Sequence, residues 1–516
     1  MYLTQGLHKS MHVRPDATAV RFMDKELTYA QLGDRVARLA GALRKLGIND
    51  GDRVAMYSLN SLRYIEYDLA VPWAGGVLNP VNIRWSAAEI LYSLDDSGTT
   101  VMIVDDAFKA AAAGMVSQAK TVRHLVYAGD GETPEGMLNY EALIAESEPI
   151  EDAWRHGGDL AGIFYTGGTT GFPKGVMLSH DNLGVSAVNA LIIGSCIEKV
   201  RYLHAMPMFH LADFAPTVSL FMSGGTHIVI PMFEPKLMLE TISRERVTET
   251  LMAPTLIQMT LDWIDQHPAE AAELDLSSLN HLTYGASPIS QTLLERARAA
   301  FPNVAFYQGY GMTELAPVGA LLFPEHHHGH LLRAAGRAAT TVEMKIVDPQ
   351  GVEVPRGTAG EIVARGPNVM LGYWNKPEET AKALRNGWMH TGDGGHMDDE
   401  GFVYIGDRIK DMIITGGENV YSTEVENAVA AHPGVAQCAV IGIPSERWGE
   451  SVHAVLVLKE GATLPLDDLR THCRERIATY KVPRSMEVRT SLPVSGVGKV
   501  LKTDLRKSAS PSERVD

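Results

Sequence analysis

Short apolar stretches of strand length alternate with amphipathic helical stretches along the first half of the chain, and this alternation restricts the fold more than any other feature. Thr28 and Gln31 form a predicted capping box at the start of a helix, and Gly47 ends it. The apolar residues of that helix step by three and four: Leu32, Val36, Leu39, Leu43 and Leu46. The elements predicted around it are a helix near residues 62–69, a helix capped by Ser86 and Glu89, and strands at 54–57 and 100–105. Such alternation predicts a mostly parallel sheet covered by helices on both faces.

The same alternation returns in the middle of the chain and gives way to shorter runs after about Gly336. Strands are predicted there at residues 226–230, 250–253, 282–284 and 305–308, which repeats the first architecture in a second subdomain. After Gly336, short alternating runs predict a small β-rich unit, with strands at 342–347, 361–364 and 402–405. The C-terminal residues are predicted to form a compact α/β unit. It contains a helix with a capping box formed by Thr423 and Glu426, and strands at 437–443 and 453–458.

The overall charge narrows the classes of ligand. The 516 residues carry a formal net charge of −16, which gives no support to nucleic-acid binding, because a protein that holds a nucleic-acid backbone needs a basic face.

The chain contains no run of the roughly eighteen apolar residues that a membrane span needs, and the first residues lack the apolar core of a signal peptide. We therefore expect a cytoplasmic protein without integral membrane association. Cys196, Cys438 and Cys473 lack Cys-x-x-Cys spacing and are expected to be packing residues.

Residues 165–175 read Tyr-Thr-Gly-Gly-Thr-Thr-Gly-Phe-Pro-Lys-Gly and lie between two predicted strands. The glycines let backbone N–H groups turn toward a ligand, and threonine hydroxyls and one lysine share the same short arc. This composition indicates a phosphate-binding loop, with a glycine-rich hairpin carrying incidental threonines as the alternative. A Walker A loop places Gly-Lys-Ser/Thr at the start of a helix, whereas here Pro173 precedes Lys174 and Gly175 follows it. A P-loop kinase or NTPase is therefore disfavoured.

Four further strings each have a simpler structural interpretation when taken alone. Residues 309–314 (Gly-Tyr-Gly-Met-Thr-Glu) follow a predicted strand, where open α/β sheets place their ligands, although a turn with a solvated glutamate fits equally well. The Asp of Thr391-Gly392-Asp393 could accept hydrogen bonds from ribose hydroxyls. The charged string 406–411, followed by Thr-Gly-Gly-Glu-Asn at 415–419, is typical of a solvated turn. Residues 493–499 place Lys499 on a glycine-rich loop.

Together, in this order and at these separations, the five strings resemble the adenylate-forming superfamily of acyl-CoA synthetases, aryl-CoA ligases, adenylation domains and luciferases. The resemblance covers nearly the whole chain, and residues 415–426 look most like bacterial fatty-acid–CoA ligases. It implies a large N-terminal domain over residues 1–408, with two stacked, mostly parallel αβα subdomains and a β-barrel-like unit at about 336–406. A small, mobile α+β C-terminal domain would cover residues 409–516.

The resemblance also implies a two-step reaction that uses ATP, Mg²⁺ and coenzyme A. The substrate carboxylate attacks the α-phosphate of ATP and releases pyrophosphate, and the acyl group then passes from AMP to the thiol of coenzyme A. A carboxylate is already ionised at neutral pH, because its pKa is about 4, so the first step needs no general base. It needs relief of the repulsion between carboxylate and triphosphate, which cations and backbone amides supply.

The resemblance assigns roles to individual residues. Lys499 would lie between the α-phosphate and the carboxylate, Thr313 would touch the α-phosphate, and Glu314 with Thr166 would hold Mg²⁺. His210 would line the carboxylate end of the acyl channel, with a histidine at the edge of the core as the alternative. The implied ATP-binding residues are Thr166, Gly167, Gly168, Thr169, Thr170, Gly171 and Lys174, then Gly285, Ala286, Ser287, Gly309, Tyr310 and Gly311, and on the ribose Asp393 and Arg408.

Lys410 matches the hinge position of the superfamily, where the C-terminal domain swings between two poses. In one pose Lys499 would face the adenylate, and in the other Gly416, Gly417 and Glu418 would replace it and help form the coenzyme A channel. Some deprotonation of the thiol must accompany transfer, because its pKa is about 8.5, and no base for it can be named.

The acid itself is the least constrained part of the prediction. The expected pocket walls, residues 209–214, 251–258 and 284–288, are rich in Met, Leu and Phe, which favours an apolar and by preference fatty acid. An aryl acid of the cinnamic or benzoic type, an acyl-AMP ligase serving a carrier protein, and a nucleotide-binding regulatory protein without turnover are the alternatives, and a homodimer is left open. Adjacent imidazoles cannot all face one ion, so His326, His327, His328 and His330 predict a solvated loop rather than a metal site.

Overall fold

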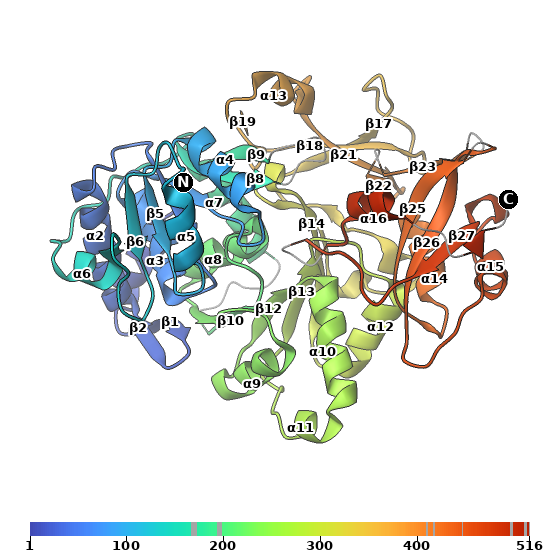
Figure 1. The fold of residues 1–516 in the computed structure, drawn as a ribbon, viewed down its shortest axis with the longest axis horizontal. Coiled ribbons are helices and arrows are strands. Elements are labelled where there is room, and N and C mark those ends of the chain that lie inside the picture. The colour runs from blue at the N-terminus through green and yellow to red at the C-terminus, as the bar shows by residue number, and fades with distance from the viewer. Residues whose placement is uncertain are drawn as a thin grey trace.

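The computed structural model describes residues 1–166, 173–192, 199–408, 411–415, 418–445, 447–495, 499–509 and 513–514. Within these ranges the strands form four sheets (Figure 1). The first sheet has the order β19 (Gly372–Tyr373), β9 (Lys174–Ser179), β8 (Leu160–Thr166), β4 (Val77–Pro80), β3 (Arg53–Tyr57), β5 (Val101–Val104), β6 (His124–Tyr127) and β7 (Leu138–Asn139). Its strands from β4 to β7 pair in parallel, as the alternation predicts.

Helices of the first sheet begin where the sequence places their caps. The Thr28 and Ser86 side chains each accept the backbone N–H of the residue three positions on, and both predicted capping boxes are confirmed. The helices of this part of the chain are α2 (Tyr29–Lys45), α3 (Leu62–Trp73), α4 (Ala87–Ser97), α5 (Lys109–Val116) and α6 (Tyr140–Ala145).

The second sheet has the order β16 (Arg337–Ala338), β15 (Val318–Leu322), β14 (Ala305–Gly311), β13 (His281–Gly285), β12 (Glu249–Met252), β10 (Arg201–His204), β11 (Thr226–Val229), β1 (Thr18–Phe22) and β2 (Lys25–Thr28). Its strands from β14 to β1 are parallel, which confirms the second mostly parallel sheet. Its helices are α1 (Gln5–Val13), α7 (His180–Leu191), α8 (Leu211–Ser223), α9 (Pro235–Glu245), α10 (Pro254–Gln266), α11 (Pro268–Ala272) and α12 (Gln291–Ala300), with 3-10 turns η1 (Thr313–Leu315), η2 (Pro324–His326) and η3 (Gly329–Arg333).

The N-terminal hairpin crosses between the two subdomains. Strand β1 precedes every strand of the first sheet in sequence, yet it pairs with β11 of the second, with Val20 opposite His227. The chain therefore returns to its own beginning to complete the second sheet, which the order of elements in the sequence does not reveal.

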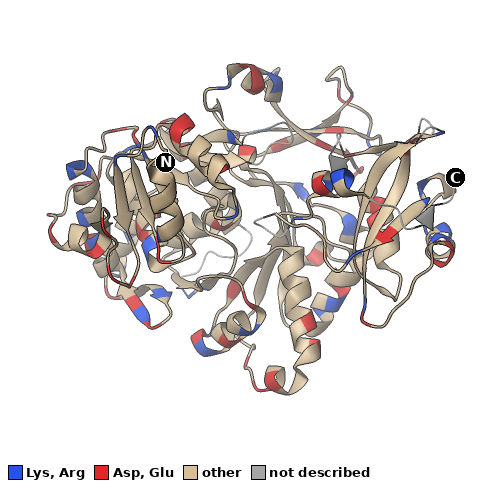
Figure 2. Cartoon of the chain, viewed as in Figure 1, with Lys and Arg blue, Asp and Glu red and all other residues tan. Residues whose placement is uncertain are grey.

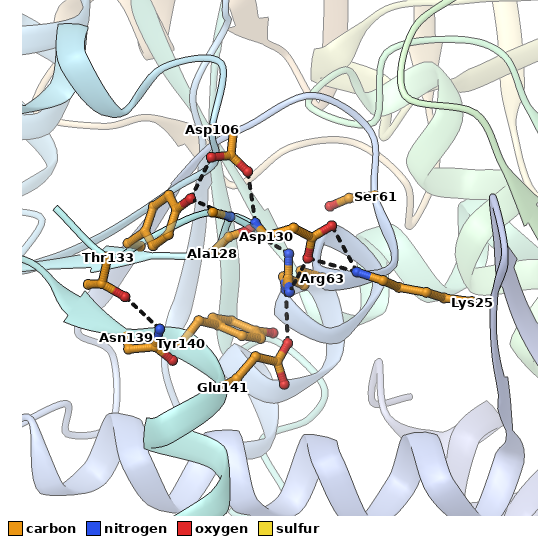
Figure 3. Close-up of polar contacts among 12 residues, drawn as sticks. Lys25, Ser61, Arg63, Asp106, Ala128, Asp130, Thr133, Asn139, Tyr140 and Glu141 are labelled. Carbon is orange, nitrogen blue, oxygen red and sulfur yellow. Dashed lines mark hydrogen bonds and ion pairs between the residues drawn. The ribbon is translucent and has the colours of Figure 1, made fainter.

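An ion network ties α3 to its neighbours on the first sheet (Figure 3). The Arg63 guanidinium donates to the Ala128 carbonyl at 2.9 Å, to Asp130 at 2.8 Å and to Glu141 at 3.0 Å. Lys25 of β2 donates to the same Asp130 at 2.7 Å. Because β2 belongs to the second sheet and Asp130 follows β6 of the first, this network joins the two.

The third sheet is the β-rich unit predicted after Gly336. It is antiparallel and consists of β17 (Glu343–Val347), β18 (Gly360–Arg365), β20 (Leu384–Arg385), β21 (Trp388–Met397) and β22 (Val403–Arg408), with α13 (Pro377–Ala383) beside it. The fourth sheet consists of β23 (Ile413–Thr415), β24 (Glu418–Val420), β25 (Val435–Ser445), β26 (Gly449–Leu458), β27 (Ser485–Val488) and β28 (Glu513–Arg514). Its helices are α14 (Ser422–Ala430), α15 (Leu466–Arg474) and α16 (Lys502–Ser508), with the 3-10 turn η4 (Thr479–Lys481).

The capping box predicted at Thr423 and Glu426 is wrong. Helix α14 begins after Tyr421, and no side chain caps it. The Glu426 carboxylate instead accepts the backbone N–H of Val440 at 2.8 Å and pairs with Lys502, also at 2.8 Å. Glu426 therefore fastens α14 to β25 and α16 rather than to its own N-terminus.

Charged residues of both signs are interspersed over the visible elements, without a basic stripe in this view (Figure 2). Among the described helices, none is both long enough and apolar enough to cross a membrane.

Candidate active site

A cavity of about 300 Å³ lies against the second sheet, lined by β10 and β12–β15, by α8 and by Lys499 from the C-terminal part of the chain. It brings together residues that are hundreds of positions apart in sequence. The predicted site residues that line it are Thr166, His210, Gly285, Ala286, Gly309, Tyr310, Gly311, Thr313, Glu314 and Lys499. Of the predicted pocket walls, Ala212, Leu251 and Tyr284 also line it.

Three glycines lie in the cavity wall at the carboxyl ends of β13 and β14. A Cβ on Gly285 would come within 2.3 Å of the Gly309 carbonyl oxygen, and one on Gly311 within 1.6 Å of the Pro317 oxygen, so only glycine fits at either position. A Cβ on Gly309 would meet no protein atom within 4 Å. Because Gly309 lines the cavity, its missing side chain leaves room for a flat ligand such as a purine base.

Glu314 is a buried acid of the cavity, with 7% of its surface exposed. The Tyr373 hydroxyl donates to its Oε1 at 2.8 Å, and its backbone oxygen accepts the Met370 N–H at 2.9 Å. Thr166 lines the same cavity. A carboxylate and a hydroxyl are the oxygen ligands that Mg²⁺ prefers, so these residues fit the predicted magnesium site.

Asp393 of β21 lies behind Tyr310 rather than in the wall of the cavity. The Tyr310 hydroxyl donates to Asp393 Oδ2 at 2.7 Å, and the carboxylate is 8% exposed. Arg408 stands opposite Asp393 in the register of β21 and β22, and the side chain of Arg408 lies outside the described part. Ser287 follows the cavity wall formed by Gly285 and Ala286.

Lys499 lines the cavity. Two hydrogen bonds join it to Ser495, from Ser495 N–H to the Lys499 oxygen at 2.7 Å and from Lys499 N–H to Ser495 Oγ at 3.1 Å. The Arg84 guanidinium, from the segment between β4 and α4, donates to the Ser495 carbonyl at 3.1 Å. A residue that follows a strand of the first sheet therefore contacts Ser495, which in turn bonds to Lys499.

Lys174 stands apart from the cavity wall. Its ammonium pairs with Glu379 of α13 at 2.6 Å and lies 5.2 Å from the centre of the Tyr373 ring. This pairing lowers the pKa of the Glu379 carboxyl. Tyr373 therefore contacts both Lys174, through its ring, and the predicted magnesium ligand Glu314, through its hydroxyl.

His210 is the N-cap of α8, and its Nδ1 accepts the backbone N–H of Ala212 at 3.2 Å. Burial lowers the pKa of His210 to about 4, so the ring is neutral at neutral pH and carries its proton on Nε2. A neutral ring at this place lines the cavity without adding charge to it.

Of the polar cavity residues that the sequence analysis missed, three form one row. Tyr202 of β10, Glu249 of β12 and His281 of β13 stand opposite one another in register across adjacent strands. No short motif contains them, because they are separated by whole helices in the chain. Tyr373 and Glu379, which contact Glu314 and Lys174, were missed for the same reason.

Several predicted residues lie outside the described part: Gly167, Gly168, Thr169, Thr170, Gly171, Lys410, Gly416 and Gly417. Glu418 begins β24 and is exposed. Beside this segment, Arg484 donates to Thr415 Oγ1 at 2.9 Å, and Arg447 and Arg484 both lie over the Trp448 ring. Arg470 is close enough to lower the pKa of Arg484 further, after burial.

The prediction that the histidine run forms a solvated loop is wrong for one of its members. His327 is buried rather than solvated, and its ring bonds to the Tyr284 hydroxyl at 3.0 Å and the Phe323 oxygen at 2.9 Å. In the described ranges, no group of three or more His, Cys, Asp or Glu side chains is arranged to hold a metal ion.

Comparison with known proteins gives consistent matches over nearly the whole chain. Residues 7–374 match the model of the AMP-binding enzyme family, and residues 424–499 match that of the AMP-binding enzyme C-terminal domain. A feruloyl-CoA synthase of Amycolatopsis sp is 41% identical over 96% of both chains, and a long-chain-fatty-acid–CoA ligase of Mycobacterium tuberculosis is 35% identical over 94% of both. The crystal structure of an anthranilate CoA ligase in complex with anthranoyl-AMP superposes with a TM-score of 0.90 at 26% identity, covering 99% of this chain and 97% of that one.

Proposed function

The chain belongs to the AMP-binding enzyme family, and on that premise we propose that it activates a compact aryl carboxylic acid as acyl-AMP and passes the acyl group to coenzyme A. The broader activity is not in question: the chain is an AMP-forming acid:CoA ligase, and it uses ATP, Mg²⁺ and coenzyme A. The α/β fold and its two mostly parallel sheets agree with that family. The proposal concerns the acid and the roles of individual residues.

The choice of a compact aryl acid rests on the size of the cavity. Its volume of about 300 Å³ stands at the lower end of the range for ligand pockets, and the wall includes the glycines of the nucleotide end as well as the acyl end. A long aliphatic chain would need the acyl end to be larger. The feruloyl-CoA synthase of Amycolatopsis sp and the anthranilate CoA ligase, whose names denote aryl acids, support the same choice.

In the adenylation step, Lys499 would neutralise the charge that builds up between the carboxylate and the α-phosphate. Thr313, three residues from Tyr310 on the same segment, would donate its hydroxyl to the α-phosphate. The base would lie over Gly309, where the absent side chain leaves space, and beside Gly285 and Ala286. Tyr310 would lie against the base, and Asp393, oriented by the Tyr310 hydroxyl, would accept from the ribose together with Arg408.

Glu314 and Thr166 would hold Mg²⁺, which neutralises charge on the phosphates when bound. Lys174 would serve the same phosphates after leaving Glu379, helped by the backbone amides of residues 167–171. Breaking the ion pair between Lys174 and Glu379 should cost little free energy, because an exposed ion pair contributes little to stability.

The second step would use the C-terminal part of the chain as a separate mobile domain, with residues 1–408 before the hinge at Lys410 and residues 409–516 after it. Gly416, Gly417 and Glu418 would then form the coenzyme A channel in place of Lys499. The arginines around Trp448 lie beside this segment and suit the anionic nucleotide end of coenzyme A.

The expectations that depend on cellular context are also kept as proposals. The protein would act in the cytoplasm, on a small-molecule acid. A fatty acid, the preference drawn from composition, stays a prediction beside the aryl acid, and so does delivery to a carrier protein.

Incubation of the purified protein with ATP, Mg²⁺, coenzyme A and a panel of acids tests the proposal. Benzoic, cinnamic, octanoic and hexadecanoic acids are compared, with AMP measured by chromatography and thioester by mass spectrometry. We expect kcat/KM for the best aryl acid to exceed that for hexadecanoic acid by about tenfold or more, because the long chain cannot enter the cavity. Faster turnover of the long-chain acid would overturn the aryl assignment, and acyl-AMP accumulating beside unused coenzyme A would indicate a carrier-protein ligase.

A further inference from the structure

Glu379 of α13 forms an ion pair with Lys174, the lysine of the predicted phosphate-binding loop. The Lys174 ammonium lies 2.6 Å from Glu379 Oε2, and the Lys382 ammonium lies 3.5 Å from Glu379 Oε1. The first pair joins residues 205 positions apart, and Glu379 belongs to none of the five strings that predict the site. Lys174 therefore has a counter-ion that the sequence alone does not indicate.

Backbone contacts hold α13 beside the strand that carries this lysine. Strand β19, which precedes α13, pairs antiparallel with β9. The Trp374 N–H donates to the Gly175 carbonyl at 2.8 Å, and the Tyr373 N–H donates to Thr380 Oγ1 in α13, also at 2.8 Å. Because all of these contacts lie within the protein, the first turn of α13 stands beside the start of β9 before any nucleotide arrives.

Lys174 stands between two sets of negative charge. On one side is Glu379, and on the other is Tyr373, whose ring centre lies 5.2 Å from the ammonium and whose hydroxyl donates to Glu314 at 2.8 Å. In the proposed function, Glu314 holds Mg²⁺ next to the phosphates. The side chains of Lys174 and Glu379 are 25% and 39% exposed, so water reaches the pair and the ammonium can exchange one partner for the other.

Release of pyrophosphate is the step at which such a counter-ion matters most. ATP is also bound through its base and ribose, whereas pyrophosphate offers only phosphate oxygens to the cations around it. When pyrophosphate dissociates, the half-buried Lys174 ammonium loses those oxygens, and a half-buried charge costs free energy unless another partner replaces them. The carboxylate of Glu379 is already in place to be that partner.

We propose that Glu379 is a positioning residue for product release, which takes Lys174 back as pyrophosphate dissociates. The inference rests on the proposed function, in which Lys174 binds the phosphates, and adds to it a residue that acts through that lysine. Glu379 and the phosphates compete for one ammonium, so Glu379 weakens the binding of both pyrophosphate and ATP. If Glu379 only held α13 in place, its removal would weaken nucleotide binding instead.

Glu379→Gln tests the direction of the effect. Thioester formation is followed at 0.15 M salt with the acid that the enzyme turns over fastest, and the inhibition constant for pyrophosphate and KM for ATP are measured. We expect both constants to fall by about two- to fivefold, the range that an exposed ion pair accounts for. Glu378→Gln is the matched control, because Glu378 is the exposed preceding residue of the same helix and the change of charge is identical. It should leave both constants unchanged.

A double-mutant cycle assigns the effect to the lysine. Lys174→Met alone should raise the inhibition constant for pyrophosphate, and adding Glu379→Gln to Lys174→Met should then change nothing further. Titration of pyrophosphate with Mg²⁺ into each protein, without acid or coenzyme A, repeats the comparison without turnover.

The outcomes separate this inference from the proposed function. An inhibition constant that is unchanged or higher in Glu379→Gln, in an enzyme that still forms thioester, overturns the inference while the proposed function stands. A lower constant that persists in the Lys174→Met background overturns the assignment to Lys174. Pyrophosphate inhibition that does not respond to Lys174→Met overturns both the inference and the proposed role of Lys174. Preference for an aliphatic acid overturns only the aryl assignment, because the assay uses the best acid of either kind.

Discussion

The Arg63 network and the row of Tyr202, Glu249 and His281 on the second sheet are both clusters of polar side chains, yet they differ in burial and in position. Arg63 donates to three oxygens of its own chain, and its partners Asp130 and Glu141 are partly exposed (Figure 3). Tyr202, Glu249 and His281 are buried and line the cavity. The first cluster lies outside the cavity, whereas the second forms part of its wall.

The difference teaches where to look for function. A polar cluster closed on itself fixes the relative position of α3, β6 and the N-terminal hairpin, and its removal should cost stability. Polar side chains in a cavity wall gain further partners when substrate binds, as expected for sites that trade stability for binding. Substitutions in the two clusters should therefore act on different measurements.

The largest effect is expected in the cavity, from Lys499→Ala. The cavity would lose its cation beside Thr313 and Glu314, and adenylation should slow by about 10²-fold or more, because charge that develops in the reaction is no longer offset. Pyrophosphate exchange measures this step. Thioester formation from supplied acyl-AMP should change little, since in the proposed mechanism a different pose would serve it.

Lys507→Ala is the matched control, because Lys507 is an exposed lysine of α16. Equal losses in both half-reactions of Lys499→Ala would contradict the two-pose mechanism.

In the Arg63 network, Arg63→Ala should lower the free energy of unfolding by about 1–2 kcal/mol, because three hydrogen bonds are lost. The loss is limited because Asp130 and Glu141 can still reach water. Urea denaturation measures the change. kcat/KM should stay within about twofold, since no residue of the network lines the cavity. Arg365→Ala, which removes an exposed ion pair with Glu343, should leave the denaturation midpoint where it was. A loss of turnover without a loss of stability in Arg63→Ala would remove the distinction between the clusters.

A smaller effect is expected for Tyr202→Phe without substrate. The hydroxyl proton has no acceptor among the described residues, and the oxygen accepts only weakly from the Leu251 backbone N–H, so its removal should change the free energy of unfolding by less than about 0.5 kcal/mol. Tyr67→Phe, which removes a paired hydroxyl, should lower it by about 1 kcal/mol. Thermal denaturation of the two variants side by side compares them. Equal destabilisation would mean that the Tyr202 hydroxyl is as well paired as that of Tyr67.

The smallest effect is expected for Arg84→Ala. Its guanidinium holds the Ser495 carbonyl through one exposed hydrogen bond, which is worth a few tenths of a kcal/mol, so adenylation should slow by about two- to threefold. The thioester step should not respond, because in the proposed two-pose mechanism Lys499 would have left the cavity by then. Comparing the two half-reactions detects the effect, and a slower thioester step would show that Arg84 acts on the whole C-terminal part.

The sequence predicted what is local and missed what depends on strand pairing. The capping boxes at Thr28 and Ser86 depend on residues three apart, and both are confirmed. The strings that supply Gly285, Tyr310, Glu314 and Lys499 are contiguous, so their meeting in one cavity followed from the resemblance. The box at Thr423 was wrong because Glu426 has better partners on β25 and α16.

Tyr202, Glu249 and His281 form a row only because β10, β12 and β13 pair in one particular register. A one-residue shift would turn the whole row to the other face. An unexpected Glu at the start of an otherwise apolar strand was the one trace that the sequence contained. Even that trace did not indicate which neighbours it would meet.

The pairing of Val20 with His227 also has a consequence for synthesis. A ribosome delivers the chain from its N-terminus, so β1 leaves the ribosome long before the strand that it pairs with. Until residues 226–229 emerge, the hairpin of β1 and β2 has an unpaired edge, and the second sheet cannot be completed. A nascent chain arrested before β11 should therefore expose this hairpin to proteases and chaperones, and one arrested well after it should protect it.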